Sequence, residues 1–99
     1  MNRPKEIQIN QFQLARLLSE EQMGIYKSIL VDNVFCTHCA GTCKNGITIT
    51  ELFLTSLNDI KVNGTCNTCD GKVTRILEFG ENKSFYNKAT DFRNSDGKE

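Results

Sequence analysis

The stretch VFCTHCAGTC, residues 34–43, places three cysteines and the only histidine of the chain within ten positions. A second stretch, GTCNTCDG at residues 64–71, repeats the spacing of two residues between cysteines. The chain therefore has two C-x-x-C pairs: Cys36 with Cys39, and Cys66 with Cys69. Such a pair can curl into a tight loop, here called a knuckle, that points both sulfurs at one ion, and two facing knuckles complete a tetrahedron.

Four thiolates in this arrangement predict a zinc site. Zn²⁺ has a filled d shell and imposes no geometry of its own, and S₄ sites are mostly structural zinc. We therefore predict that Zn²⁺ is held by four ligands: Cys36, Cys39, Cys66 and Cys69. Such a site has no open coordination position, so we expect a binding protein and not an enzyme.

The length of 99 residues is typical of one domain with a small core, so we expect external reinforcement, and the five cysteines are the natural place to look for it. The first ten residues, MNRPKEIQIN, are polar, and no later stretch approaches the roughly 18 apolar residues of a membrane span. We therefore expect the cytoplasm, where thiols stay reduced and paired cysteines are more often metal ligands than cystines.

Charge is evenly distributed along the chain. The segments 1–35, 36–80 and 81–99 each carry four basic and four acidic residues, so none forms the basic stripe typical of nucleic-acid binding. Nucleic-acid binding stays open as an alternative through a patch that Lys61, Lys72 and Arg75 would form on a sheet. A protein is the partner that we expect, with no membrane contact, and a homodimer is one arrangement that the sequence leaves open.

We expect an α+β fold in three parts. Residues 1–33 predict a helical segment that packs on the rest, with Asn10 as one N-cap and Ser19 with Gln22 as a capping box for a second helix. In that second helix Met23, Tyr26 and Leu30 would line one face.

The middle part, residues 34–80, predicts a small antiparallel sheet. Apolar residues alternate in three runs, with the turn SLND between the first two: Ile47 and Ile49; Ile60 and Val62; Val73, Arg75, Leu77 and Phe79. The phase slips near Thr50, which indicates either a β-bulge or a short helical turn. Residues 81–99 form a polar tail in which Phe85, Ala89 and Phe92 recur at helical spacing, so one short helix could dock before the chain frays.

The order knuckle, strand, turn, strand, knuckle, strand over residues 34–80 resembles the zinc ribbons. This class is found in transcription factors, ribosomal proteins and small adaptors, so the resemblance implies a zinc-organised sheet that acts as an interaction module. Zinc ribbons commonly have glycine directly after the second cysteine of a knuckle, where this chain has Ala40 and Asp70. A looser likeness links CTHCAG and CNTCDG to the zinc-domain repeat of J-protein cochaperones.

Other uses of the thiols remain open. Iron in the same four thiolates would give a rubredoxin-like electron-transfer protein, and one pair could instead carry out thiol redox chemistry. Cys43 and His38 lie beside the predicted ligands, and we expect both outside the ligand set, with Cys43 partly buried or exposed. Gly41 and Gly71 each follow a knuckle by two places, where we expect an unusual backbone angle. Serine at any of the four ligands should weaken metal binding, whereas Cys43→Ser should not.

Overall fold

The computed structural model describes residues 5–32, 34–43 and 45–95. Helices combine with antiparallel strands, which confirms the predicted α+β class. The elements in chain order are β1 (Ile7–Ile9), α1 (Gln11–Leu17), α2 (Glu20–Asp32), β2 (Phe35–Cys36), β3 (Gly41–Thr42), β4 (Ile47–Leu54), β5 (Ile60–Cys66), β6 (Lys72–Leu77), the 3₁₀ turn η1 (Phe79–Glu81) and α3 (Lys83–Ser95).

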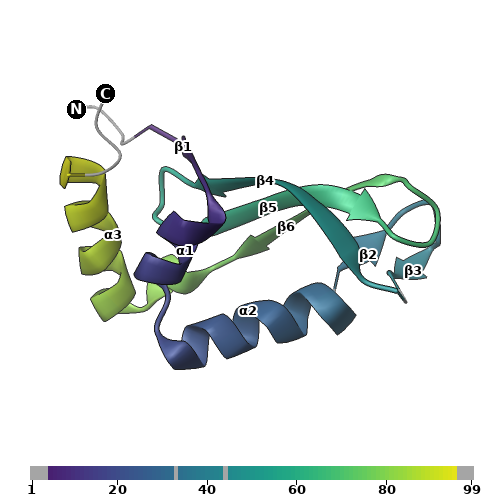
Figure 1. The fold of residues 1–99 in the computed structure, drawn as a ribbon, viewed down its shortest axis with the longest axis horizontal. Coiled ribbons are helices and arrows are strands. Elements are labelled where there is room, and N and C mark those ends of the chain that lie inside the picture. The colour runs from purple at the N-terminus through teal and green to yellow at the C-terminus, as the bar shows by residue number, and fades with distance from the viewer. Residues whose placement is uncertain (1–4, 33, 44, 96–99) are drawn as a thin grey trace.

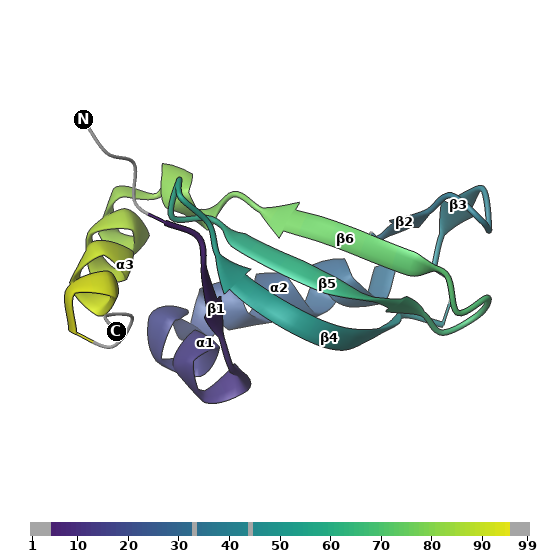
Figure 2. The same ribbon diagram turned by 90° about the horizontal axis from the view of Figure 1, so that it is seen from above.

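Four strands form one antiparallel sheet in the order β1-β4-β5-β6, and β2 and β3 form a separate two-stranded hairpin. Helix α2 runs along one face of the large sheet, while α1 and α3 lie at the end of the molecule opposite the β2–β3 hairpin (Figure 1). The opposite face of β4, β5 and β6 has no described helix over it (Figure 2). The molecule therefore has a hairpin end and a helical end, joined by the long strands.

The phase slip in the first long strand is a β-bulge and not a helical turn. In the pairing of β4 with β5, Ile47 lies opposite Cys66 and Leu54 opposite Ile60, and the register shifts between Ile49 and Glu51. A bulge inserts one extra residue and so moves the alternation from one face to the other. The bulge lets β4 contribute to the core at one end and to the cysteine region at the other.

Both predicted helix starts are confirmed as capping boxes. The Asn10 side chain accepts from the N–H of Gln13 at 2.8 Å, and the Gln13 side chain accepts from the N–H of Asn10 at 2.9 Å. The same reciprocal pair joins Ser19 and Gln22, at 3.1 and 2.9 Å. These bonds satisfy N–H groups in the first turn of each helix that would otherwise lack a partner. They explain why α1 begins directly after Asn10 and α2 directly after Ser19.

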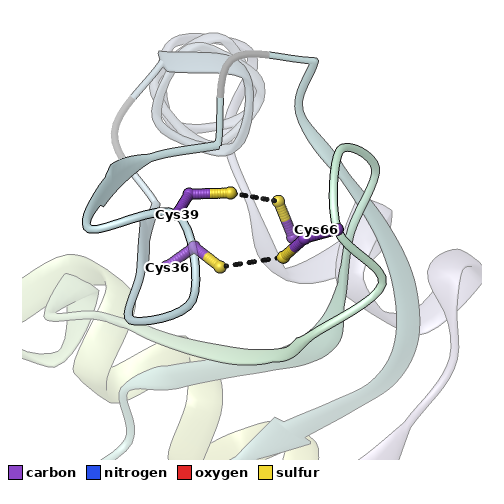
Figure 3. Close-up of side chains that lie close together, drawn as sticks. Cys36, Cys39 and Cys66 are labelled. Carbon is purple, nitrogen blue, oxygen red and sulfur yellow. Dashed lines mark hydrogen bonds between the residues drawn. The ribbon is translucent and has the colours of Figure 1, made fainter.

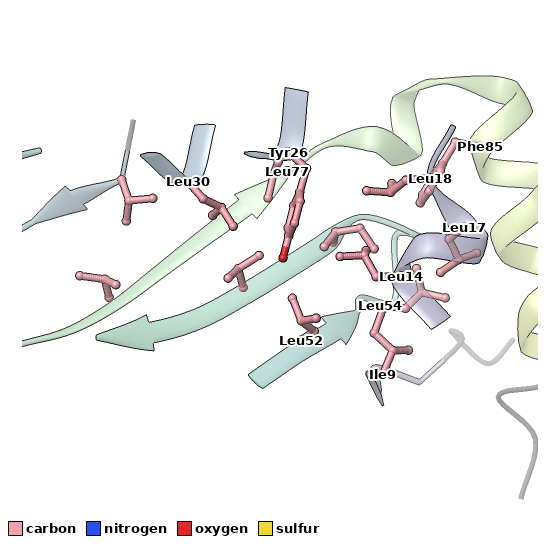
Figure 4. Packing of buried hydrophobic residues seen from close by; sticks show 14 of the residues in the cluster. Ile9, Leu14, Leu17, Leu18, Tyr26, Leu30, Leu52, Leu54, Leu77 and Phe85 are labelled. Carbon is pink, nitrogen blue, oxygen red and sulfur yellow. The ribbon is translucent and has the colours of Figure 1, made fainter. Parts of the chain in front are cut away.

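The core lies between α2 and the sheet and continues to the helical end (Figure 4). Tyr26 and Leu30 of α2 are buried against the sheet, as predicted, and Met23 packs beside them, partly buried. Leu14 and Phe85 extend the cluster into α1 and α3. None of the helices in the described part of the chain combines the length and the apolar character that a membrane crossing needs.

Two features differ from the sequence prediction. The N-terminal part is not wholly helical, because Ile7–Ile9 form β1 and pair with Leu52–Leu54 of β4. Three residues are too few to show an alternating pattern, which explains why this strand was not predicted.

The second difference concerns the basic side chains of the sheet. Arg75 lies directly opposite Val62, which is 0 % exposed, so the two share the face that α2 covers. Lys61 and Lys72 stand on the other face, since their positions alternate with these. The prediction that Lys61, Lys72 and Arg75 lie near one another is therefore wrong. Phe79 also leaves the predicted strand, because β6 ends at Leu77 and η1 begins at Phe79.

A polar contact fastens α3 at the helical end. The helix predicted from Phe85, Ala89 and Phe92 is present, and all three side chains are buried. Asn58, in the β4–β5 turn, is 1 % exposed and accepts from Arg93 Nε at 2.8 Å. The remaining bonds of this Asn58–Arg93 clasp run from Asn58 Nδ2 to Tyr86 O and Thr90 Oγ1, and from the Arg93 guanidinium to Lys5 O and Thr55 O.

Candidate metal centre

The fold brings all four predicted ligands together at the hairpin end. Cys36 is the last residue of β2, and Cys39 follows in the turn that leads to β3. Cys66 is the last residue of β5, and Cys69 lies in the turn that leads to β6. The two knuckles face each other with their sulfurs pointing inward (Figure 3), and the four Sγ atoms lie within 4.8 Å of one another.

The closest sulfur contacts cross from one knuckle to the other. Cys36 Sγ lies 3.4 Å from Cys69 Sγ, and Cys39 Sγ lies 3.8 Å from Cys66 Sγ. With Zn–S bonds of about 2.3 Å, the edge of a regular ZnS₄ tetrahedron is about 3.8 Å. The spacing of these sulfurs therefore fits one tetrahedral ion, and the group can hold a metal.

Backbone N–H groups are aimed at the first sulfur of each knuckle. The N–H groups of Cys39 and His38 lower the pKa of Cys36. The N–H groups of Thr68 and Cys69 lower the pKa of Cys66 to about 6. These donors stabilise a thiolate, which is the form that binds metal. The neighbouring thiol of Cys69, together with burial and the Cys66 thiol, raises the pKa of Cys39 to about 12, so without metal the Cys39 thiol keeps its proton.

This asymmetry predicts how many protons leave when metal binds. Cys66, with its pKa lowered to about 6, is already a thiolate at pH 7.5, whereas Cys39, with its pKa raised to about 12, must lose a proton to the solvent. We expect Zn²⁺ to release fewer than four protons per chain, about two to three. Calorimetric titration in two buffers of different ionisation enthalpy measures this number. Release of all four would show that no thiolate is preformed.

The sharp reversals of the knuckles occur one residue earlier than predicted. Ala40 and Asp70 have φ angles of 58° and 63°, in the left-handed region, whereas neither Gly41 nor Gly71 has a positive φ. The expectation that the two glycines supply the unusual angle is therefore wrong. The positions that need it are those directly after the second cysteine, and both carry a side chain there.

Glycine at position 40 should stabilise the protein. A non-glycine residue in the left-handed region costs roughly 1 kcal/mol, and alanine gains no local hydrogen bond in return. We expect Ala40→Gly to raise the free energy of unfolding by about 1 kcal/mol, and Asp70→Gly by less, because aspartate tolerates this region better. Chemical denaturation of the two variants measures both values. A loss of stability in Ala40→Gly would contradict the assigned backbone.

The two neighbours of the site stand outside the group of four. Cys43 is 2 % exposed, which corrects the expectation of a partly buried or exposed thiol. Burial raises its pKa to about 12, and its thiol also interacts with those of Cys66 and Cys36. His38 is exposed, and its ring lies against the backbone of Gly71 in the second knuckle.

Polar residues near the second knuckle were not identified from the sequence. Asn67 donates from Nδ2 to Asn45 O at 3.0 Å and from its backbone N–H to Gly46 O at 3.0 Å, and its Oδ1 accepts from Thr48 Oγ1 at 2.6 Å. Asn45 also donates to Thr68 Oγ1 at 3.2 Å. These bonds tie the second knuckle to the start of β4 without any metal. The only feature of the sequence that could have indicated these bonds is that polar residues, Asn67 and Thr68, stand between Cys66 and Cys69.

The fold and the site together define a small α+β protein whose four-cysteine group has the dimensions of a metal site. Comparison of the chain with models of protein families, with curated proteins and with solved structures gives no match.

Proposed function

We propose that this is a zinc-binding protein of the zinc-ribbon class, in which Cys36, Cys39, Cys66 and Cys69 hold one structural Zn²⁺. The convergence of four sulfurs from two distant segments within 4.8 Å carries the proposal. A closed set of four thiolates leaves no coordination position for a substrate, so we propose that the metal is structural and that the protein acts by binding and not as an enzyme. We place it in the cytoplasm, where the thiols remain reduced.

The metal content of the purified protein distinguishes the proposed structural zinc from iron-based electron transfer and from thiol redox chemistry. Elemental analysis of protein purified under reducing conditions should give one zinc per chain and no iron. One iron per chain, with a red colour, would favour the rubredoxin-like electron-transfer function instead. Protein that is folded and free of transition metal would favour thiol redox chemistry, because reduced thiols are then the native state.

We further propose that the zinc supports a protein-interaction module. The sheet face opposite α2 carries no described helix, and the exposed apolar side chains include Phe12 and Leu57. The placement of the basic residues disfavours nucleic-acid binding. Lys61 is paired with Glu6 at 2.9 Å and lies over the Phe53 ring, and Arg75 is on the other face of the sheet from Lys72.

Titration at low salt tests that choice of partner, because phosphate contacts are strongest there. We expect no binding of short DNA or RNA at protein concentrations of about 50 µM, since non-specific nucleic-acid binding has dissociation constants of about 1–100 µM at physiological salt and becomes tighter at low salt. Tight binding that weakens steeply with salt would replace the protein-interaction function by nucleic-acid recognition. Sedimentation of the same samples distinguishes a monomer from a homodimer.

A further inference from the structure

The side chain of His38, in the first knuckle, contacts the backbone that follows the second knuckle. His38 stands between Cys36 and Cys39, and its ring lies on the backbone of Gly71. A Cβ atom added at Gly71 would lie 2.4 Å from His38 Cδ2, 3.1 Å from Cγ and 3.2 Å from Nε2. These separations are shorter than van der Waals contact, so the ring occupies the space that any other residue at position 71 would fill. Gly71 therefore leaves room for this ring, and a larger residue at position 71 would have to displace the exposed His38 side chain.

His38 and Gly71 are each close in the chain to one of two ligands that contact each other, Cys36 and Cys69. His38 lies two residues after Cys36, and Gly71 lies two residues after Cys69. Cys36 and Cys69 form the closest sulfur contact of the site, at 3.4 Å. The ring contact thus fixes the distance between the two backbone segments that hold this pair.

Cys69 is the most exposed of the four ligands. Cys36 and Cys66 are buried and Cys39 is half-buried, whereas Cys69 is exposed. The hydrogen bonds from Asn45 and Thr48 hold the second knuckle at Asn67 and Thr68, before Cys69. On the far side of Cys69, Gly71 O accepts from the N–H of Cys66 at 2.8 Å, and the His38 ring contacts the chain at this same glycine.

We propose that His38 is a positioning residue for the metal site: its ring, packed on Gly71, holds the Cys36–Cys69 side closed and slows the release of the ion. This inference rests on the proposed zinc site and deepens it, because a site closed in this way retains its metal and does not hand it on. The imidazole acts by contact and not as a ligand, since only the four cysteines form the metal-binding group among the described residues.

The two glycines provide a matched comparison. Gly71 and Gly41 each stand two places after the second cysteine of a knuckle, but a Cβ at Gly41 meets nothing within 4 Å. The measurement is the rate at which zinc-loaded protein transfers its metal to an excess of a chromogenic chelator. We expect Gly71→Ala to transfer zinc about tenfold faster than wild type and Gly41→Ala to stay within about twofold.

Variants of His38 identify the cause. His38→Ala should release zinc about as fast as Gly71→Ala, and the double variant no faster than either single one, because both remove the same contact. His38→Phe keeps a ring and should release zinc at close to the wild-type rate. With Co²⁺ in place of zinc, all these variants should keep the charge-transfer absorption of four thiolates.

Several results would overturn the proposal. These are equal release from Gly71→Ala and Gly41→Ala, additive effects in the double variant, or a His38→Phe variant as fast as His38→Ala. If the wild-type protein binds no metal, the proposed function is wrong, but the contact between His38 and Gly71 can still be tested in the metal-free protein. In that case hydrogen exchange of residues 66–71 must be faster in metal-free Gly71→Ala than in metal-free Gly41→Ala, and equal exchange would refute the positioning role.

Discussion

Replacing Cys66 by serine is expected to abolish zinc binding and to open the hairpin end of the molecule while the helical end stays folded. Cys66 is 0 % exposed and joins β5 to the second knuckle, so its thiolate is both a ligand and part of the packing. The loss in metal affinity should exceed about a hundredfold, which is already reached when only an outer hydrogen-bond partner of a ligand is removed. Zinc per chain and hydrogen exchange of β2, β3 and the knuckles measure the two effects.

Cys43→Ala is the matched control for Cys66→Ser. Cys43 is also a buried cysteine of the same region, but it lies outside the group of four sulfurs. Its truncation should cost about 1 kcal/mol of stability through lost packing and leave one zinc per chain. Alanine is the better choice than serine, because burial of Cys43 would place an added hydroxyl in an apolar site. A zinc-free Cys43→Ala protein, or a zinc-loaded Cys66→Ser protein, would contradict the assigned ligands.

Replacing Asn58 by glycine is expected to destabilise the helical end and to leave the metal site intact. Asn58 has a φ of 62°, which glycine adopts readily, so the variant removes the side-chain bonds without adding backbone strain. The loss of its side chain leaves Arg93 Nε without its Asn58 acceptor and removes the part-buried bonds from Asn58 to Tyr86 O and Thr90 Oγ1. We expect the free energy of unfolding to fall by about 3 kcal/mol.

Asn63→Ala serves as the control for Asn58→Gly. Asn63 also makes side-chain hydrogen bonds, to Glu51 and Thr74, but it does so on the uncovered face of the sheet. Its replacement should cost less than about 1 kcal/mol, because water replaces the lost partners. The comparison is made by chemical denaturation of zinc-loaded samples. Equal losses in the two variants would show that the Asn58–Arg93 clasp adds nothing beyond ordinary surface bonds.

The parts of the structure that the sequence predicted are those with local signals. The capping box of Ser19 and Gln22 spans only four residues, so all the groups that form it are visible in the local sequence. The slip near Thr50 is a break in a period of two, which a bulge explains. The grouping of the four cysteines also follows from spacing, because two C-x-x-C pairs in one small domain are typical of a single metal site.

The parts that were missed depend on contacts between distant residues. Asn58 and Arg93 are 35 positions apart, and nothing near either one indicates that they meet. His38 on Gly71 is a contact between two knuckles whose relative placement only the fold defines. The backbone angles of Ala40 and Asp70 were misplaced by one residue, because glycine was taken as the marker for a left-handed angle that other residues adopt here.

The two ends of the molecule are thus held by different means. The hydrophobic cluster reaches both ends, but the Asn58–Arg93 clasp secures only the helical end, where it joins α3 to the β4–β5 turn. At the hairpin end, β2 and β3 contribute only two residues each, which is too little sheet to be stable alone. A metal bound by both knuckles would supply the missing connection, and this is why we expect Cys66→Ser and Asn58→Gly to act on opposite ends.

X-ray absorption at the zinc K-edge of the purified wild-type protein tests the central claim most directly, because it reports the atoms bound to the ion. We predict four sulfur neighbours at about 2.3 Å and no nitrogen or oxygen in the coordination shell. A shell with nitrogen or oxygen neighbours, or a preparation that is folded without a bound transition metal, would contradict the claim that these four thiolates converge on one ion.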